Sequence, residues 1–155
     1  MFNRNISVEY AREWAYKRNP RYYDFDKLGG DCTNFVSQCL HAGGIEMNYS
    51  SLGWYYTNLN SRAPAWTGVN EFWNFGINNT GKGVRFDQCA INDLEIADFI
   101  QLYNGTRFYH NLLVTKVEKV LGSKVIYVSA HDFNAFNRPL SNYMFSSYRC
   151  GKILN

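Results

Sequence analysis

The sequence predicts an α+β fold in which N-terminal helices pack on an antiparallel sheet. Two segments in the first third of the chain, residues 7–18 and 31–42, carry apolar residues at helical spacing. After residue 97, short segments alternate apolar and polar residues and are joined by tight turns, as sequential antiparallel strands are. Because helices and strands are separated along the chain, we expect α+β and not an alternating α/β order.

The two predicted helices have recognisable ends. Ser7 is expected to cap the first helix, which ends before Asn19-Pro20. The second helix begins at Asp31 or Cys32, with Asp31 as its expected N-cap, and ends at Gly43-Gly44. Its buried stripe follows the spacing i, i+3, i+4, i+7, i+8 and consists of Cys32, Phe35, Val36, Cys39 and Leu40.

Residues 45–95 show less regular patterning. Thr67 is expected to cap a short helix that carries Val69, Phe72 and Trp73. We interpret this region as an elaboration beside the active cleft and not as a second domain. The whole chain, residues 1–155, is expected to form a single domain, because this length is sufficient for one substantial core.

The strand pattern occupies the C-terminal part of the chain. Turns are expected at Asn104-Gly105 and at residues 121–123. In the segment after the first turn, Leu112 and Val114 share a face with His110. The four expected strands are Asp98–Tyr103, His110–Lys119, Lys124–His131 and Tyr148–Leu154.

The composition excludes several classes of protein. The formal net charge is +3, from 16 Lys and Arg against 13 Asp and Glu, which is too small and too scattered to favour nucleic-acid binding. The N-terminal residues form no apolar signal sequence, and no segment is long enough to span a membrane. We therefore expect a cytoplasmic protein or a domain exported by another route. The oligomeric state is left open.

The four cysteines are expected to remain free thiols. Cys32 and Cys39 are two helical turns apart and cannot bond to each other. No Cys-x-x-Cys pair exists, and His41 does not give a zinc-binding spacing with Cys39. We therefore expect neither a metal nor a cofactor.

Cys32 is the strongest candidate for a catalytic residue. A single cysteine on an apolar helical stripe is usually a packing residue. However, Cys32 follows Gly29-Gly30 and lies at a helix N-terminus, where unpaired N–H groups and the helix dipole favour thiolate over thiol. Its own backbone N–H could also point at a developing oxyanion. Asp31 is then expected to support the site as a cap.

Histidines on two neighbouring strands complete the expected site. His110 begins one strand and is the candidate base, although a strand histidine is more often structural. His131 ends the next strand, and in an antiparallel hairpin these two positions lie side by side. Asp132 is the competing third residue, but strand alternation points it to the opposite face unless the strand has already broken. We therefore expect His131 to orient His110.

The motif order resembles that of the putative amidase domain family of Gram-positive bacteria. The specific element is residues 29–38, Gly-Gly-Asp-Cys-Thr-Asn-Phe-Val-Ser-Gln, followed by Ala42-Gly43-Gly44. Weaker elements follow in the family's order at residues 98–101, at Tyr109-His110 and at residues 128–131. The likeness covers most of the chain. One departure is Ala97, which stands where the family usually has glycine.

This resemblance implies a fold and a chemistry. The family is similar to NlpC-type and CHAP cysteine peptidases and amidases, which have a papain-like fold. Carried over, the resemblance implies Cys32 as nucleophile, His110 as base and His131 as third member of a triad. It also implies cleavage of an amide bond in peptide or peptidoglycan-type substrates through an acyl-thioester. For the second oxyanion donor the candidates are Tyr22 and Tyr23.

Two alternatives remain open from the sequence. An acyltransferase would use the same cysteine and histidine until the thioester is resolved. A catalytically silent module that binds the cell wall or a partner would be supported by exposed aromatic residues, and Trp54, Tyr55, Tyr56 and Trp66 are the candidates. An intact cysteine at a helix N-terminus argues against the second alternative.

Overall fold

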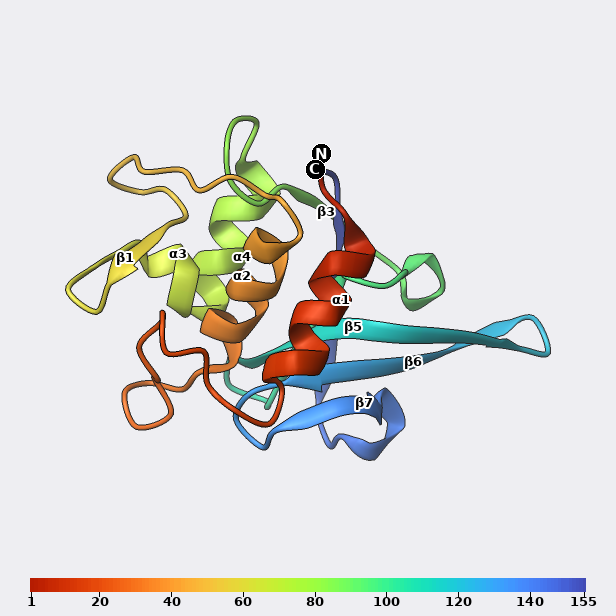
Figure 1. The fold of residues 1–155 in the computed structure, drawn as a ribbon. Coiled ribbons are helices and arrows are strands. Elements are labelled where there is room, and N and C mark those ends of the chain that lie inside the picture. Colours follow the sequence, from red (N-terminus) through yellow and green to blue (C-terminus); the bar gives the residue numbers. More distant parts are fainter.

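The computed structural model describes residues 1–155 and has the expected α+β architecture (Figure 1). Six antiparallel strands form one sheet in the order β3-β8-β4-β5-β6-β7. The helices are α1 (Arg4–Trp14), α2 (Cys32–Ala42), α3 (Pro64–Thr67) and α4 (Val69–Asn78). The sheet strands are β3 (Phe86–Cys89), β4 (Phe99–Tyr103), β5 (Phe108–Val120), β6 (Ser123–Ala130), β7 (Ala135–Pro139) and β8 (Ser147–Ile153), and a small separate hairpin consists of β1 (Tyr56–Asn58) and β2 (Ser61–Arg62).

The second predicted helix is confirmed, and the first is shifted. Helix α2 begins at Cys32 and is followed by Gly43 and by Gly44, which has the left-handed φ of +112° that favours glycine after a helix. Helix α1 begins earlier than expected, because Asn3 and not Ser7 caps it, with the N–H of Ile6 donating to the Asn3 side chain at 3.1 Å. The apolar spacing in the sequence thus predicted the positions of the helices more accurately than the sequence predicted their N-terminal cap residues.

The four expected strands are confirmed within about two residues, as β4, β5, β6 and β8. Strands β3 and β7 were not predicted, because both are short and contain polar residues that weaken the alternation. Thr67 does not cap α4. It ends α3, and Gly68 occupies the cap position of α4.

The sheet carries an apolar core on each face. On one face, Leu113 and Phe99 pack with residues of the helices. On the other face, Leu112 and Val114 pack with Leu94 and Leu140 from the connecting segments. Helix α2 therefore covers the Leu113 face of β5, although the sequence pattern grouped His110 with Leu112 and Val114. His110 meets α2 at the end of the strand and not across the middle of the sheet.

Polar side chains on α2 fasten it to the segment after it. Ser37 donates to the carbonyl oxygen of Trp66 at 2.9 Å and accepts from the indole N–H of Trp54 at 3.0 Å. Asn34 accepts from the indole N–H of Trp66 at 2.9 Å. Both tryptophans are fully buried, and Tyr56 is also buried. These three aromatics therefore do not form the exposed surface that the alternative of a binding module would need, because their rings fill the core against α2, and Tyr55 is half-buried.

The two ends of the chain lie close together (Figure 1), and the buried carboxylate of Asp98 connects them. Asp98 accepts hydrogen bonds from the Arg4 guanidinium at 2.6 Å and from the Ile153 N–H at 2.9 Å. Arg4 also donates to the carbonyl oxygen of Ile153 at 2.8 Å. This cluster ties α1, β4 and β8 together. None of the helices has the length and apolar character that a membrane span requires.

Candidate active site

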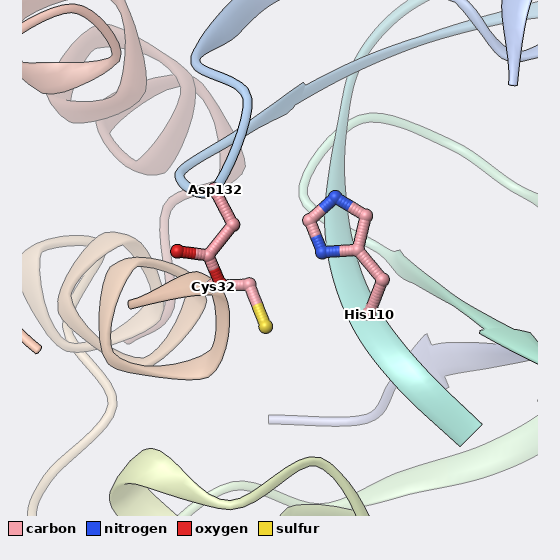
Figure 2. Close-up of side chains that lie close together, drawn as sticks. All are labelled: Cys32, His110 and Asp132. Carbon is pink, nitrogen blue, oxygen red and sulfur yellow. The ribbon is translucent and has the colours of Figure 1, made fainter. Parts of the chain in front are cut away.

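Three side chains from separate parts of the chain meet at the N-terminus of α2 (Figure 2). They are Cys32 at the start of the helix, His110 near the start of β5 and Asp132 just after β6. One ligand-type atom from each residue, a sulfur, a ring nitrogen and a carboxylate oxygen, lies within 4.8 Å of the other two. Cys32 and His110 are each only 5% exposed, and Asp132 is half-buried. The structure thus brings together a thiol, an imidazole and a carboxylate.

The end of strand β6 leaves room for the thiol beside β5. The last pair of the β5–β6 ladder at this end is Leu113 with Ser129, and β6 ends at Ala130. Along a strand, successive backbone N–H groups point alternately to its two neighbouring strands. The N–H of Val114 points to β4, so the N–H of Asn111, three residues earlier, points to the side on which β6 lies. The Asn111 N–H is instead a donor to the Cys32 sulfur. The sulfur therefore occupies the position that a longer β6 would have filled.

Asp132 reaches the site because the chain turns sharply after β6. Asp132 and Phe133 have φ values of +61° and +63°, which end the strand and its alternation of faces. Both carboxylate oxygens of Asp132 accept from the backbone N–H of Asp31, at 3.0 and 3.1 Å. A Cβ atom on Gly30 would lie 2.6 Å from this carboxylate, and Gly30 has a φ of +97°. Glycine at position 30 therefore allows the close approach of Asp132.

His131 does not lie against His110. Its Nδ1 atom is hydrogen-bonded to the Asp31 carboxylate, and its Nε2 atom is 2.8 Å from the carbonyl oxygen of Trp14. Its ring stacks on Phe35 with centroids 4.1 Å apart. The expectation that the hairpin would bring the two histidines together fails, because both ring nitrogens of His131 are engaged under α2. In its place the structure brings Asp132 beside Cys32 and His110.

Asp31 has a different role from the expected helix cap. Its side chain makes no capping bond to the helix. It accepts from the N–H of Phe25 at 2.8 Å and from the Asn34 side chain at 2.9 Å, in addition to its bond with His131. Asp31 is fully buried and connects the N-terminus of α2 to the end of β6. It therefore fixes the position of Cys32 relative to Asp132, although its own side chain is directed toward Phe25, Asn34 and His131.

Burial disfavours charge on both the thiol and the imidazole. It raises the pKa of Cys32 to about 12, and the Asp132 carboxylate acts in the same direction, while the N–H of Asn111 opposes it. Burial lowers the pKa of His110 to about 4, and Asp132 partly offsets this change. Desolvation thus opposes the thiolate that the helix N-terminus was expected to favour, and it opposes the imidazolium as well. Burial therefore favours a neutral thiol and a neutral imidazole in the resting pair.

A cleft of about 600 Å³ opens beside His110. Its walls come from the glycine turn, from the start of β5 and from the segment after β6. The Nε2 atom of His110 is buried and has no hydrogen-bond partner, so it is available to a ligand in this cleft. No residue between 45 and 95 lines it, which corrects the expectation that this region forms the cleft wall. The lining residues are Asp26, Gly30, Tyr109, His110, Asp132, Phe133, Arg138, Asn142, Tyr143 and Met144.

Tyr23 is not among the residues that line this cleft. Its N–H donates to the Tyr56 hydroxyl at 2.8 Å, and its carbonyl oxygen accepts from Asn34 at 3.0 Å. Its ring packs edge-on against Phe25. The backbone of Tyr23 thus supports the position of α2, and nothing places its hydroxyl group at the thiol.

The same three side chains form a set that could ligate a metal. Thiolate, imidazole and carboxylate are all zinc ligands, and three protein ligands with an open side describe many catalytic zinc sites. Two features favour nucleophilic chemistry at this position. The backbone N–H of Asn111 donates to the sulfur, as a developing thiolate requires, and both Asp132 oxygens already accept from the Asp31 N–H.

All four cysteines are free, as the sequence predicted.

Unbroken strand alternation would place His131, and not Asp132, on the face of His110, so the sequence pattern favoured His131. The available signal was the Asp132-Phe133-Asn134 segment, whose Asp and Asn residues are typical of turns and tolerate left-handed conformations.

The structure also explains why the family usually has glycine at the position of Ala97. Ala97 has a φ of +67°, a conformation in which glycine is favoured, so this chain accepts a methyl group in a strained position.

Comparisons with known proteins place the chain in a family. A family model described as "Putative amidase domain" matches residues 1–153. YhbB of Bacillus subtilis (strain 168) is 31% identical over 93% of this chain and 49% of its own length, and YjcM of the same organism is 26% identical over 86% of this chain and 31% of its own length. The chain thus spans about half or less of these relatives. No solved structure matches it significantly. On the match over nearly its whole length, this chain belongs to the putative amidase domain family.

Proposed function

We propose that this chain hydrolyses amide bonds with Cys32 as nucleophile, His110 as general base and Asp132 as the residue that stabilises the protonated imidazole. The observation that carries the proposal is the meeting of these three side chains beside a cleft that reaches His110. A thiol and an imidazole whose reactive atoms lie within 4.8 Å of each other, with a carboxylate beside both, are the elements of a nucleophilic hydrolase. Membership of a family named for amidase activity supports the same reaction.

The resting neutral pair determines how the reaction begins. As the sulfur attacks the substrate carbonyl carbon, its proton passes to His110, so the thiolate never has to exist alone in the buried site. The S–C bond forms, and the oxyanion is placed near the N–H of Cys32, which lies in the first turn of α2 and has no partner within the helix. Asp132 then lies beside an imidazolium, and its carboxylate raises the pKa of His110.

The second half of the reaction returns the enzyme to its resting state. The protonated His110 gives its proton to the leaving nitrogen, and the C–N bond breaks. A water molecule then attacks the thioester while His110 accepts a proton from it. The S–C bond breaks, a carboxylic acid leaves, and the proton returns to the sulfur.

We further propose a papain-like arrangement and cell-wall peptides as the substrate class. A cysteine at a helix N-terminus, facing a histidine on an antiparallel sheet, is the arrangement that the NlpC-type and CHAP enzymes use. The resemblance in motif order, from residues 29–38 to residues 128–131, supports this assignment. Peptide amides of the bacterial wall are therefore the first substrates to screen.

The test is release of amines from a panel of wall peptides and simple peptide amides by the purified protein. We expect Cys32→Ala to abolish release and Cys39→Ala to retain it, because Cys39 is a buried thiol on the same helix but in the apolar core. Mass spectrometry of the wild type is expected to find an acyl adduct on Cys32. Turnover by Cys32→Ala would overturn the proposal.

Two additional measurements separate the alternatives. Chelators are expected to leave turnover unchanged, and added Zn²⁺ to inhibit it by binding the thiolate. Loss of turnover on chelation, with recovery on adding metal, would instead favour a catalytic zinc site held by the same three side chains. Addition of free amines to the assay would reveal acyl transfer as new amide products.

A further inference from the structure

We propose that the part of the substrate lying beside His110 carries a carboxylate and that Arg138 binds it. This inference rests on the proposed function, because it takes the His110 cleft as the substrate site. It adds a substrate class, namely acyl amides whose amine portion is acidic, and a residue that selects it. The first observation is that Arg138, on β7, is the only cationic side chain that lines this cleft.

The positive charge of Arg138 has no partner in the protein. No carboxylate lies within ion-pair distance of its guanidinium, although Asp26 and Asp132 line the same cleft. Both of these carboxylates are engaged elsewhere. Asp26 pairs with Arg18 at 2.9 Å, and Asp132 accepts from the N–H of Asp31. An unpaired, half-buried guanidinium in a cleft is available to an anion, and its planar shape matches a carboxylate.

Tyr143 holds Arg138 in a defined place relative to the site. The Arg138 guanidinium carbon lies 5.5 Å from the centre of the Tyr143 ring, and that ring lies 6.2 Å from the His110 ring. Stacking on an aromatic face limits the motion of an arginine while leaving its N–H groups free to donate. A carboxylate bound to Arg138 is thus separated from His110 by about the width of the tyrosine ring.

The reaction places the amine portion of the substrate in this cleft. His110 gives its proton to the leaving nitrogen, so the leaving group must lie beside the imidazole. The buried Nε2 atom of His110 is without a hydrogen-bond partner, whereas the Tyr143 hydroxyl lies close enough to the Arg138 guanidinium for that cation to offset part of the burial that raises the pKa of the phenol. Phe133 and Met144, which are 86% and 91% exposed, add apolar side chains at the rim of the cleft. The cleft therefore offers one cation, one unused ring nitrogen and apolar walls to a single acidic group.

The experiment compares two alkylating probes that differ in one charge. N-iodoacetyl-glutamic acid α-amide carries a side-chain carboxylate, and N-iodoacetyl-glutamine α-amide carries a neutral carboxamide. The glutamyl or glutaminyl group follows the reactive carbon as the amine portion follows a scissile carbonyl. The rate of Cys32 modification is read by peptide mass spectrometry and divided by the rate of the same probe with N-acetylcysteinamide.

We expect the wild type to prefer the carboxylate probe by about tenfold, the effect of one charge-assisted pair. Arg138→Gln should bring the ratio close to one, and Arg138→Lys should retain part of the preference because it retains the charge. The matched control is Arg12→Gln. Arg12 also stacks on a β7 aromatic, Phe136, at 4.8 Å, but it does not line the cleft, so the ratio should keep its wild-type value.

The outcomes distinguish this inference from the proposed function. Equal modification of Cys32 by both probes in the wild type would overturn the role of Arg138 and leave the nucleophile intact. An unchanged preference in Arg138→Gln would also overturn it. If neither probe modifies Cys32 while amine release survives Cys32→Ala, the proposed function fails, and this inference fails with it.

Discussion

At the scale of single residues, the site is defined by groups that burial keeps uncharged. The thiol of Cys32 has its pKa raised and the imidazole of His110 has its pKa lowered, both mainly by desolvation. Asp132 raises both pKa values, which disfavours the thiolate and favours the imidazolium. In the proposed reaction, the charges of the thiolate and the imidazolium therefore appear only as the proton passes from Cys32 to His110, beside the Asp132 carboxylate.

The first prediction concerns the alkylation of Cys32. Its rate with iodoacetamide should rise about tenfold per pH unit from pH 6 to pH 9 without a plateau, because the thiol titrates at about 12. Asp132→Asn should shift the profile to lower pH, since the carboxylate raises the thiol pKa. A plateau near neutral pH in the wild type would contradict this and would indicate a preformed ion pair.

The second prediction concerns His110 and folding stability. Its pKa is about 4 in the folded protein and about 6.5 when unfolded, so between these values the unfolded state binds more protons. Stability should therefore rise with pH across this window, by about 3 kcal/mol. Urea unfolding at pH 4.5 and 7.0 should show this dependence in the wild type and a weaker one in His110→Gln. Equal pH dependence in both proteins would refute the prediction.

A third prediction separates the two residues that compete for the third position. Asp132→Asn should lower turnover at least tenfold with little loss of stability, because the amide oxygen still accepts from the Asp31 N–H while the charge beside His110 is gone. His131→Ala should instead cost about 3 kcal/mol of folding free energy, since it removes a buried ring and two hydrogen bonds. The reverse pattern would restore His131 as the orienting residue.

At the scale of elements, the site depends on two turns meeting at one helix end. The turn before α2 contains Gly29 and Gly30, and the turn after β6 contains Asp132 and Phe133 in left-handed conformations. The turn before α2 must have no bulky side chain at the point of contact, so that the turn after β6 can pack against it. This contact, and not the helix alone, places a carboxylate beside the thiol.

The fourth prediction uses the two glycines as a matched pair. Gly30→Ala should disturb Asp132, because the added Cβ would lie 2.6 Å from its carboxylate oxygen, whereas a Cβ on Gly29 would meet nothing within 4 Å. Both positions have positive φ, so both variants should lose roughly 1–2 kcal/mol of stability. Only Gly30→Ala should also lose turnover, measured where both variants are fully folded. Equal turnover in the two variants would argue against the Gly30–Asp132 contact.

At the scale of the whole molecule, the buried Asp98 cluster joins the first helix to the neighbouring strands β4 and β8. The fifth prediction is that Asp98→Ala costs about 3 kcal/mol of folding free energy, because it leaves the Arg4 guanidinium without its buried partner. Glu95→Gln is the control. Glu95 pairs with the same Arg4 but is half exposed, so its change should cost less than about 1 kcal/mol in urea unfolding. Equal costs would show that burial of Asp98 is not the cause.

Much of this arrangement was predictable from local sequence. The stripe of Cys32, Phe35 and Val36 determined that α2 would be a buried helix, and the glycines around it determined its ends. Alternation likewise predicted β5 and β6 and placed His110 at the start of a strand. These features depend on residues only a few positions apart, so the sequence alone was sufficient for them.

The identity of the third residue was decided only by the tertiary structure. Asp132 lies one residue beyond His131, and alternation would have sent it to the other face. The left-handed turn breaks that alternation, and the N–H of Asp31, which is 101 residues away in sequence, holds the carboxylate. The same holds for the burial of Trp54 and Trp66 against α2. Contacts between distant segments carry no local period, so the sequence determined the candidate nucleophile and its helix, and the packing of the chain determined what surrounds it.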